Sequence, residues 1–378
     1  MNALVTGGAG LIGSHIVDRL LERGHRVRIV DNLQKPCHLH GKPAWIPKDA
    51  EFIEGDVRDK PLMTKALKGI DVVFHEAAYQ GLLPEFSQFF SVNSAGTAML
   101  YEVIVENGYP VQKIIVASSQ AVYNEGIYRC PFHGEVHPPS RPLEQLEHGW
   151  WELFCPACGE ELSAVPTSEV HATPQIMYAQ SKYSQETIGL QLGRTYNIPT
   201  VALRYAITVG PRQSHFNAYS GVCSIFSTRI INDLPPVVYE DGLQTRDYIY
   251  VGDVVDANLF VMEDPRADFR VFNVGTGKST NVLSLLEILT RALGKDIEPK
   301  VAGAYRLGDI RHFQPDVSRL AALGWTASTP LEKGLNNYVA WLVTQPDVRE
   351  YFSEAETVMK RLGVIRAVQP RPRKAMAA

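Results

Sequence analysis

Residues 2–31 read NALVTGGAGLIGSHIVDRLLERGHRVRIVD, and this stretch decides the fold class. A short run of β-forming residues (2–6) leads into a glycine-rich turn, after which apolar side chains recur at helical spacing until Gly24. A second strand is predicted over 26–31. Further strands are predicted over 51–57, 71–78, 113–119 and 200–205. Strands that alternate with helices predict right-handed βαβ units and a doubly wound parallel sheet covered on both faces.

The turn between the first strand and the first helix is rich in glycine. Gly7, Gly10 and Gly13 form a GxxGxxG pattern, which lets backbone N–H groups approach a pyrophosphate at the positive end of the helix dipole. Asp31 ends the second strand, where a carboxylate accepts hydrogen bonds from the ribose hydroxyls of NAD and repels the 2′-phosphate of NADP. The pattern therefore predicts a Rossmann-type site for NAD.

A tyrosine and a lysine are spaced for acid–base chemistry. Tyr178 and Lys182 lie four positions apart in a predicted helix, so both side chains project from one face. A phenol with a pKa near 10 is a poor base, but an ammonium at about 4 Å in an effective dielectric near 20 contributes roughly 4 kcal/mol, or about 3 pKa units. Such pairs are common by chance on exposed helices. Ser119 strengthens the prediction because it ends a strand and therefore faces the ligand crevice.

The composition excludes several classes of protein. Thirty-seven basic and forty-one acidic side chains give a net charge of −4, which argues against a nucleic-acid-coating or membrane-surface protein. No apolar run approaches the roughly 18 residues that a membrane span requires. The sequence opens directly on a strand without a leader-like segment, and its five cysteines do not form a disulfide framework. We therefore expect a cytoplasmic protein without nucleic-acid or membrane partners.

Three regions are predicted along the chain. Residues 1–198 form the NAD-binding domain, residues 199–363 form mainly a smaller, mixed substrate-binding lobe, and the Pro- and Arg-rich residues 364–378 form a flexible tail. The alternation of strands and helices breaks over 128–173, a stretch rich in proline that holds three of the five cysteines. This stretch is interpreted as an insertion. A helix is also predicted over about 347–362.

The insertion carries two knuckle-like turns, CPFHG (130–134) and CPACG (155–159). Each spacing lets two ligands approach one tetrahedral ion, and the glycine permits the turn. The Cys₃His set Cys130, His133, Cys155 and Cys158 predicts a structural zinc ion. Reduced, unliganded thiols and a ribbon that has lost its metal are the alternatives. The knuckles lack a basic stripe, which argues against nucleic-acid binding through them.

Several motifs together carry a family resemblance: TGGAGLIGSHIVDRLL (6–21), DN (31–32), ASSQAVY (117–123), YAQSK (178–182), GPRQ (210–213) and RDYIYVGDV (246–254). In this order they resemble the extended short-chain dehydrogenase/reductases of the NAD-dependent nucleotide-sugar epimerase/dehydratase family. The resemblance implies that Ser119, Tyr178 and Lys182 are catalytic and that Lys182 also hydrogen-bonds the nicotinamide ribose. It further implies that the substrate is a nucleotide-diphosphate sugar.

The same resemblance implies two sets of binding residues. The expected NAD-binding residues are Gly7, Gly10, Leu11, Ile12, Gly13, Asp31, Asn32, Asp56, Val57, Ala77, Ala78, Asn93, Tyr178 and Lys182. The expected substrate-binding residues are Gln120, Asn217, Arg246 and Arg306, with the two arginines gripping the diphosphate. Without the family context, a polar strand end explains Asp56 and Val57 equally well, and surface salt bridges explain the arginines.

The residues after Ser119 bear on the reaction. Family members that dehydrate sugars carry an Asp-Glu pair there, and sugar-acid decarboxylases carry a Glu in the second position, whereas this chain has Gln120 and Ala121. The resemblance therefore implies an epimerase that acts at C4 through a transient 4-keto sugar. A nucleotide-sugar 4-reductase or dehydrogenase and a CDP-sugar 2-epimerase are the alternatives. A non-catalytic NAD sensor is disfavoured because Tyr178 and Lys182 are both present.

Two further features refine the resemblance. Ala206-Ile207 replaces the Phe-Asn that related chains often carry, which implies a deoxy or otherwise less polar hexose. The cysteine turns, GPRQSHFNAYSGV (210–222) and GDIRH (308–312) are most like the dTDP-L-rhamnose 4-epimerase branch, with UDP-hexose 4-epimerases as neighbours. Family members usually dimerise through two helices per subunit, here expected over about 94–106 and 178–195, so a homodimer is expected.

Overall fold

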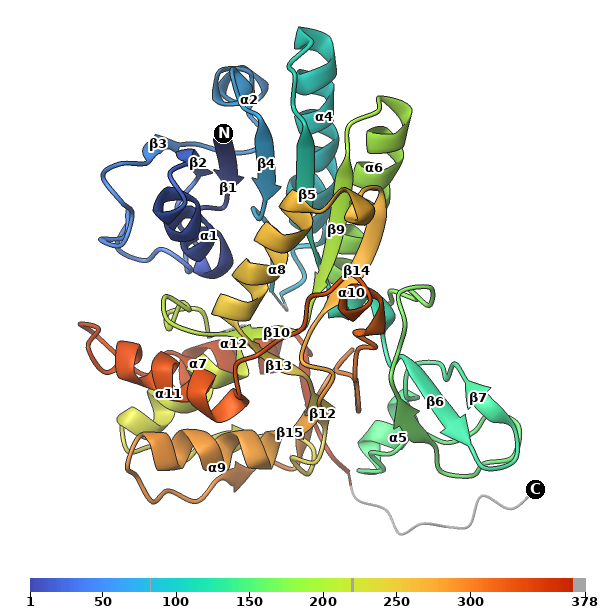
Figure 1. Ribbon diagram of the computed structural model, residues 1–378. Helices are drawn as coiled ribbons and strands as arrows, with labels where there is room; N and C mark the ends of the chain where they lie inside the picture. Colours follow the sequence, from blue (N-terminus) through green and yellow to red (C-terminus); the bar gives the residue numbers. More distant parts are fainter. Residues whose placement is uncertain (82, 219–220, 370–378) are drawn as a thin grey trace.

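The computed structural model describes residues 1–81, 83–218 and 221–369 (Figure 1). Its centre is a seven-stranded parallel sheet in the order β14-β9-β5-β4-β1-β2-β3. These strands are β1 (Asn2–Thr6), β2 (Arg26–Asp31), β3 (Glu51–Glu54), β4 (Val72–His75), β5 (Lys113–Ser119), β9 (Thr200–Tyr205) and β14 (Arg270–Val274). Val5 of β1 lies opposite Ile29 of β2 and Phe74 of β4. The strand order reverses at β1, which opens a crevice at the carboxyl ends of the strands.

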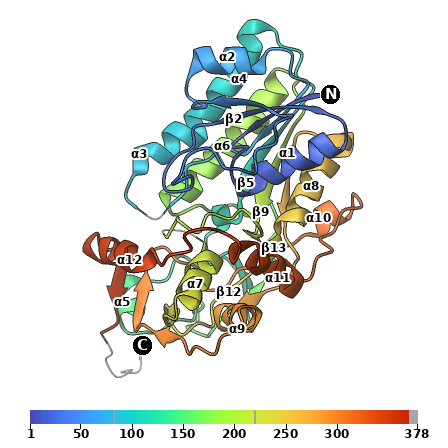
Figure 2. The same ribbon diagram turned by 90° about the vertical axis from the view of Figure 1, so that its left-hand side faces the viewer.

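Helices cover both faces of the sheet (Figure 2). On one face, α1 (Leu11–Glu22) packs against α8 (Val251–Glu263). On the other face lie α2 (Lys60–Leu67), α4 (Gly96–Asn107) and α6 (Met177–Thr195). Because both faces are covered, β4 and β9 consist entirely of buried residues. The predicted Rossmann-type α/β fold is confirmed. Among the described helices, none has both the length and the apolar character needed to cross a membrane.

The boundary between the lobes differs from the one predicted between residues 198 and 199. Strands β9 and β14 and helix α8 all follow residue 198, yet they belong to the central sheet and its helical cover. The chain therefore leaves the larger lobe and returns to it, since Arg270–Val274 pairs in parallel with β9. A pairing between such distant segments leaves no local pattern in the sequence.

The smaller lobe lies beyond the carboxyl ends of the strands (Figure 1). Its elements are β10 (Ile207–Val209), α7 (Val222–Ile231), β11 (Val237–Val238), β12 (Thr245–Arg246), β13 (Tyr248–Tyr250), β15 (Thr280–Asn281), α9 (Val282–Ala292), β16 (Lys300–Val301), β17 (Ala304–Arg306), α11 (Leu331–Leu342), α12 (Phe352–Arg361) and β18 (Ile365–Ala367). The helix predicted over 347–362 is α12. Strand β18 pairs with β17, so residues 365–367 are not part of a loose tail as predicted, and residues 370–378 lie outside the described residues.

The insertion forms a small unit of its own. Strand β6 (Ile127–Cys130) pairs antiparallel with β7 (Gly134–Val136) and with β8 (Ser163–Val165), and the short helix α5 (Leu143–Glu147) follows β7. Its core consists of five buried side chains: Tyr128, Cys130, Leu153, Cys155 and Leu162. A core of this size supplies little hydrophobic stabilisation, so the unit depends on other contacts.

Candidate functional site

A cavity of about 610 Å³ opens at the carboxyl ends of the central strands. It extends from the glycine-rich turn to α6 and to residues 206–217 at the edge of the smaller lobe. In doubly wound sheets, ligands bind in such crevices. Most of the predicted site residues line it: Gly7, Gly10, Leu11, Ile12, Gly13, Asp31, Asn32, Asp56, Val57, Ala77, Ala78, Ser119, Gln120, Tyr178, Lys182 and Asn217.

The glycine-rich turn packs as closely against its neighbours as a backbone allows. Gly7 has a φ of 68°, and a Cβ there would lie 2.7 Å from the backbone nitrogen of Ala77. A Cβ on Gly13 would overlap the carbonyl oxygen of Gly7. Gly10 precedes α1 and provides no side-chain cap, which leaves the first N–H groups of the helix available to an anion. This arrangement fits the pyrophosphate of a dinucleotide.

Two carboxylates form the edge of the cavity beside β2. Asp31 is 8% exposed, and its oxygens accept hydrogen bonds from the backbone N–H groups of Ala9 (3.0 Å) and Leu33 (2.9 Å). These bonds fix its orientation toward the cavity. Hydrogen bonds from Arg58 hold the pKa of Asp56 down at about 2, so this carboxylate is ionised at neutral pH. Arg58 balances the charge of Asp56, so the negative charge that suits ribose hydroxyls and opposes a 2′-phosphate is that of Asp31.

The predicted catalytic residues meet at the far end of the cavity. Tyr178 and Lys182 project from α6, and Ser119 faces them from the end of β5. Burial raises the pKa of Tyr178, and a hydrogen bond with Ser119 opposes this shift only in part. Lys182 donates to Gln185 on its own helix, and burial lowers the pKa of its ammonium to about 8. Burial therefore opposes the acidification of the phenol that the sequence predicts, and the effect of the Lys182 charge on Tyr178 stays a prediction.

Three predicted residues do not line the cavity. Asn93 is fully buried in the helical segment η1 (Phe90–Ala95), where its Nδ2 donates to Ser181 Oγ over 2.9 Å and braces α6. Arg246 and Arg306 both pair with Asp309, at 2.9 and 3.2 Å. The two guanidinium groups share this one carboxylate, and Arg306 Nε is buried without a hydrogen-bond partner in the described part of the chain. Their role at the diphosphate stays a prediction from the resemblance.

The residues 212–214 line the cavity, although they were not predicted as site residues. Arg212 Nη2 pairs with Asp18 at 2.6 Å, while its Nη1 is buried without a hydrogen-bond partner in the described part of the chain. Three other polar atoms are buried without a hydrogen-bond partner among the described residues: Gln120 Oε1, Gln213 Oε1 and Ser214 Oγ. Buried polar atoms require partners, which the phosphates and hydroxyls of a nucleotide sugar would provide. The GPRQ motif, which contains Arg212, is the sequence feature that could have identified these site residues.

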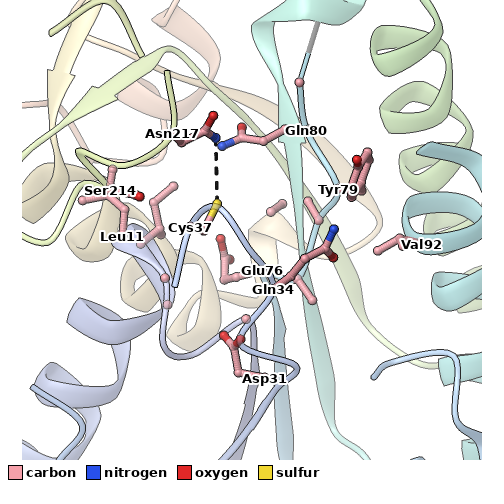
Figure 3. A pocket seen from close by; sticks show the side chains of 18 of the residues that line it. Leu11, Asp31, Gln34, Cys37, Glu76, Tyr79, Gln80, Val92, Ser214 and Asn217 are labelled. Carbon is pink, nitrogen blue, oxygen red and sulfur yellow. Dashed lines mark hydrogen bonds between the residues drawn. The ribbon is translucent and has the colours of Figure 1, made fainter. Parts of the chain in front are cut away.

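The smaller lobe also reaches the cavity through Asn217 (Figure 3). Asn217 Nδ2 lies 3.8 Å from Cys37 Sγ, which belongs to the loop after β2. Burial raises the pKa of the Cys37 thiol, so it is un-ionised at neutral pH. The contact joins the two lobes across the mouth of the cavity.

The four predicted zinc ligands come together at one end of the insertion, with all ligand atoms within 4.8 Å of one another. Cys130 Sγ lies 3.6 Å from Cys158 Sγ, and His133 Nδ1 lies 3.5 Å from the sulfurs of Cys130 and Cys155. In a tetrahedral zinc site, bonds of about 2.3 Å to sulfur and about 2.05 Å to nitrogen separate two sulfurs by about 3.8 Å and sulfur from nitrogen by about 3.6 Å. The sulfurs are too far apart for a disulfide. The spacing fits a tetrahedral ion.

Buried ion pairs fasten the insertion to the smaller lobe. Arg141 of the insertion pairs with Glu240 at 2.8 Å. Arg311 of the smaller lobe is 1% exposed and pairs with Glu152 of the insertion at 2.5 Å. Within the smaller lobe, Arg311 also pairs with Glu240 at 3.1 Å. Arg141 also donates to the carbonyl oxygen of Asp309 over 2.8 Å. The insertion therefore supports the loop whose Asp309 holds both Arg246 and Arg306.

Comparison with known proteins agrees with these features. The family model described as the NAD dependent epimerase/dehydratase family matches residues 3–145 and 156–275, and its unmatched stretch lies within the insertion. The dTDP-L-rhamnose 4-epimerase of Burkholderia thailandensis is 33% identical over 355 residues, which cover 91% of this chain and 95% of the relative.

Two solved structures have the same architecture. The UDP-glucose 4-epimerase of Thermotoga maritima with UDP-glucose superposes with a TM-score of 0.74 at 33% identity, covering 91% of this chain and 99% of the other. The UDP-glucose 4-epimerase of Thermus thermophilus in complex with NAD gives a TM-score of 0.74 at 29% identity, covering 92% of this chain and 100% of the other. The similarity therefore extends over both lobes.

Proposed function

The chain belongs to the NAD-dependent epimerase/dehydratase family of enzymes, and we propose on that premise that it inverts C4 of a nucleotide-diphosphate sugar. One observation carries the proposal: Ser119, Tyr178 and Lys182 line the same cavity as the glycine-rich turn. Gln120 and Ala121 follow Ser119, and neither has the acidic side chain that a dehydratase or decarboxylase of this family uses. Epimerisation requires one acid–base group and a sugar that turns over in its site.

The residues of the chain have separate tasks in this reaction. NAD, held by the glycine-rich turn, Asp31 and the end of α6, supplies reversible hydride acceptance when it is bound. Tyr178 removes the proton from the O4 hydroxyl and later returns it, while Ser119 holds the same oxygen by a hydrogen bond. The 4-keto sugar rotates between these two events. Because burial raises the pKa of Tyr178, the phenol depends on the positive charge that Lys182 brings to this end of the cavity.

Within this class, the proposed substrate is dTDP-L-rhamnose. The 33% identity to the Burkholderia thailandensis enzyme over nearly the whole chain supports it. Ala206 and Ile207 line the cavity, and apolar side chains suit a 6-deoxy sugar, which has one hydroxyl fewer than a hexose. Gln120 Oε1 and Arg212 Nη1 offer hydrogen bonds to the remaining polar groups.

Purified protein is expected to convert dTDP-L-rhamnose into its C4 epimer without added NAD and without net formation of NADH. Proton NMR follows the sugar, and absorbance follows the reduced cofactor. UDP-glucose and a CDP-hexose serve as comparison substrates for the base and the sugar. Stoichiometric NADH without an epimer would contradict the proposal and indicate a dehydrogenase.

A structural zinc ion in the insertion is part of the proposal. The near-tetrahedral spacing of Cys130, His133, Cys155 and Cys158 supports it. Four protein ligands fill the coordination sphere, so the ion has no open position for a substrate and serves the fold. The ion would stabilise the insertion, whose hydrophobic core is small, since metal binding supplies folding free energy where apolar burial is small.

Elemental analysis of the purified protein is expected to find one zinc ion per chain, and Cys155→Ser should contain none. Without the metal, limited proteolysis should cut the insertion between residues 131 and 162, because its five buried side chains hold it only weakly. Cys37→Ser, which lies outside the cluster, is the matched control and should retain its zinc. Full zinc content in Cys155→Ser would rule out this site.

A homodimer is the proposed assembly, and light scattering tests its mass. Helices α4 and α6 lie side by side and pack against each other (Figure 1). Exposed apolar side chains occur on and before α4, at Phe86, Phe90 and Val105, and a second copy would cover them. The cytoplasmic location stays a prediction from the sequence.

A further inference from the structure

Glu76 lies at the floor of the cavity, directly after β4 (Figure 3). Its Oε1 is 3.0 Å from the hydroxyl oxygen of Tyr205, which ends β9. The same hydroxyl is 3.0 Å from Asn258 Oδ1 on α8. Neither the proposed mechanism nor the family resemblance gives Glu76 a role, yet it is a partly buried carboxyl group in the reaction centre.

The hydrogen-bond geometry around Tyr205 indicates which of its neighbours carries a proton. The orientation of the Asn258 amide is fixed, because its Nδ2 donates to the carbonyl oxygen of Val254 over 2.8 Å. Tyr205 therefore faces two oxygen acceptors with a single hydroxyl proton. Both contacts are favourable only if Glu76 carries a proton that it donates to Tyr205, while Tyr205 donates to Asn258. In agreement, burial raises the pKa of Glu76 to about 7.

Lys182 of α6 lines the same cavity as Glu76, and the two groups interact electrostatically. Burial lowers the pKa of Lys182 to about 8, and the charges of Glu76 and Glu186 oppose this shift. Glu186, however, is already matched: Arg204 donates to both of its oxygens, at 2.9 and 2.6 Å, and Ser118 donates to it over 2.8 Å. Glu76 has no arginine at ion-pair distance among the residues that the structure describes.

The other titratable groups around Glu76 stay uncharged near neutral pH. Burial raises the pKa of Tyr205 well above its usual range. His75, the preceding residue on β4, is buried between the hydroxyls of Thr6 and Thr97, and burial lowers its pKa to about 3. The contact from α8 is the uncharged amide of Asn258. Charge changes beside Lys182 therefore come from Glu76.

We propose that Glu76 is a positioning residue of the reaction centre, which holds a proton through Tyr205 and, once ionised, keeps the ammonium of Lys182 protonated. As the pH rises through neutrality, Glu76 loses the proton that it donates to Tyr205, since its pKa is raised to about 7. The new carboxylate then stabilises the ammonium in the range where Lys182 would otherwise lose its proton. Glu76 thus extends the activity of the acid–base pair toward alkaline pH. This inference rests on the proposed function.

The test is the pH dependence of kcat/KM in Glu76→Gln. The amide mimics the protonated carboxyl, since it still donates to Tyr205, so kcat/KM at pH 6 should stay within about threefold of wild type. The alkaline limb of the profile should move down by about one pH unit, because the ammonium has lost its counter-charge. Glu263→Gln, which removes an exposed carboxylate from α8, is the control and should keep the wild-type profile. An alkaline limb that does not move in Glu76→Gln overturns the proposal.

A second measurement is independent of catalysis. The infrared difference spectrum of wild type minus Glu76→Gln should show the C=O stretch of a protonated carboxyl at pH 6, and this band should disappear by about pH 8. If the band titrates in this way but no nucleotide sugar is epimerised, the proposed function fails while the proton on Glu76 is established. Absence of the band at pH 6 overturns the proton assignment whatever the activity.

Discussion

Tyr178→Phe is expected to lower kcat for epimerisation by about a thousandfold and to leave the NAD content of the purified protein unchanged. The substitution removes the hydroxyl that takes the proton from the sugar but keeps the ring, which packs 6.1 Å from that of Phe89. Steady-state kinetics and the absorbance of released cofactor measure the two quantities. The thousandfold loss corresponds to about 4 kcal/mol of transition-state stabilisation.

The matched control for this prediction is Tyr183→Phe. Tyr183 lies on the same helix, α6, but is not among the residues that line the cavity. Loss of the Tyr183 hydroxyl should change kcat by less than about threefold, because this residue does not line the cavity. Comparable losses in the two variants would show that Tyr178 acts through the packing of α6, and the assignment of the proton acceptor would be wrong.

Gly13→Ala is expected to abolish tight NAD binding, with an affinity at least about a hundredfold weaker than in wild type. The new Cβ would overlap the carbonyl oxygen of Gly7, which is backbone and cannot rotate away. Helix α1 must then move from the turn, and its first N–H groups leave the position at which they meet the pyrophosphate. Calorimetric titration with NAD measures the affinity.

Ser14→Ala, one position further along α1, is the control for this change. Ser14 is also buried, but the substitution removes an atom where Gly13→Ala adds one. NAD affinity should therefore stay close to that of wild type, because only a weak hydrogen bond to the carbonyl oxygen of Leu11 is lost. Equal NAD affinity in Gly13→Ala and wild type would contradict the cofactor site itself.

The cofactor half of the site was predictable because its signals are local. The glycine pattern, the acidic end of β2 and the spacing of Tyr178 and Lys182 each depend on neighbours in the sequence, and all of these residues line the cavity. Of the predicted substrate residues, Gln120 and Asn217 line the same cavity, whereas Arg246 and Arg306 do not. Whether Arg246 faces a phosphate or Asp309 depends on how a distant loop folds, and the sequence carries no periodicity that reports it.

The pKa values of the site residues also could not be predicted from the motif. The motif identifies Tyr178 and Lys182 as partners, but the pKa of each depends on desolvation in the folded chain. Glu76 is a clear example: it follows an apolar strand and looks like an ordinary strand end in the sequence. Its importance comes from Tyr205 and Asn258, which are brought to it by strands and helices far along the chain.

The ion pairs beneath the insertion bear on how this chain could lose or gain it. Deletion of the segment would remove Glu152 from Arg311 and Arg141 from Glu240, whereas Arg311 and Glu240 would remain paired with each other at 3.1 Å. An ancestor or an engineered short form without the insertion would therefore lose two ion pairs of a buried network in one step, one with its cation and one with its anion in the insertion.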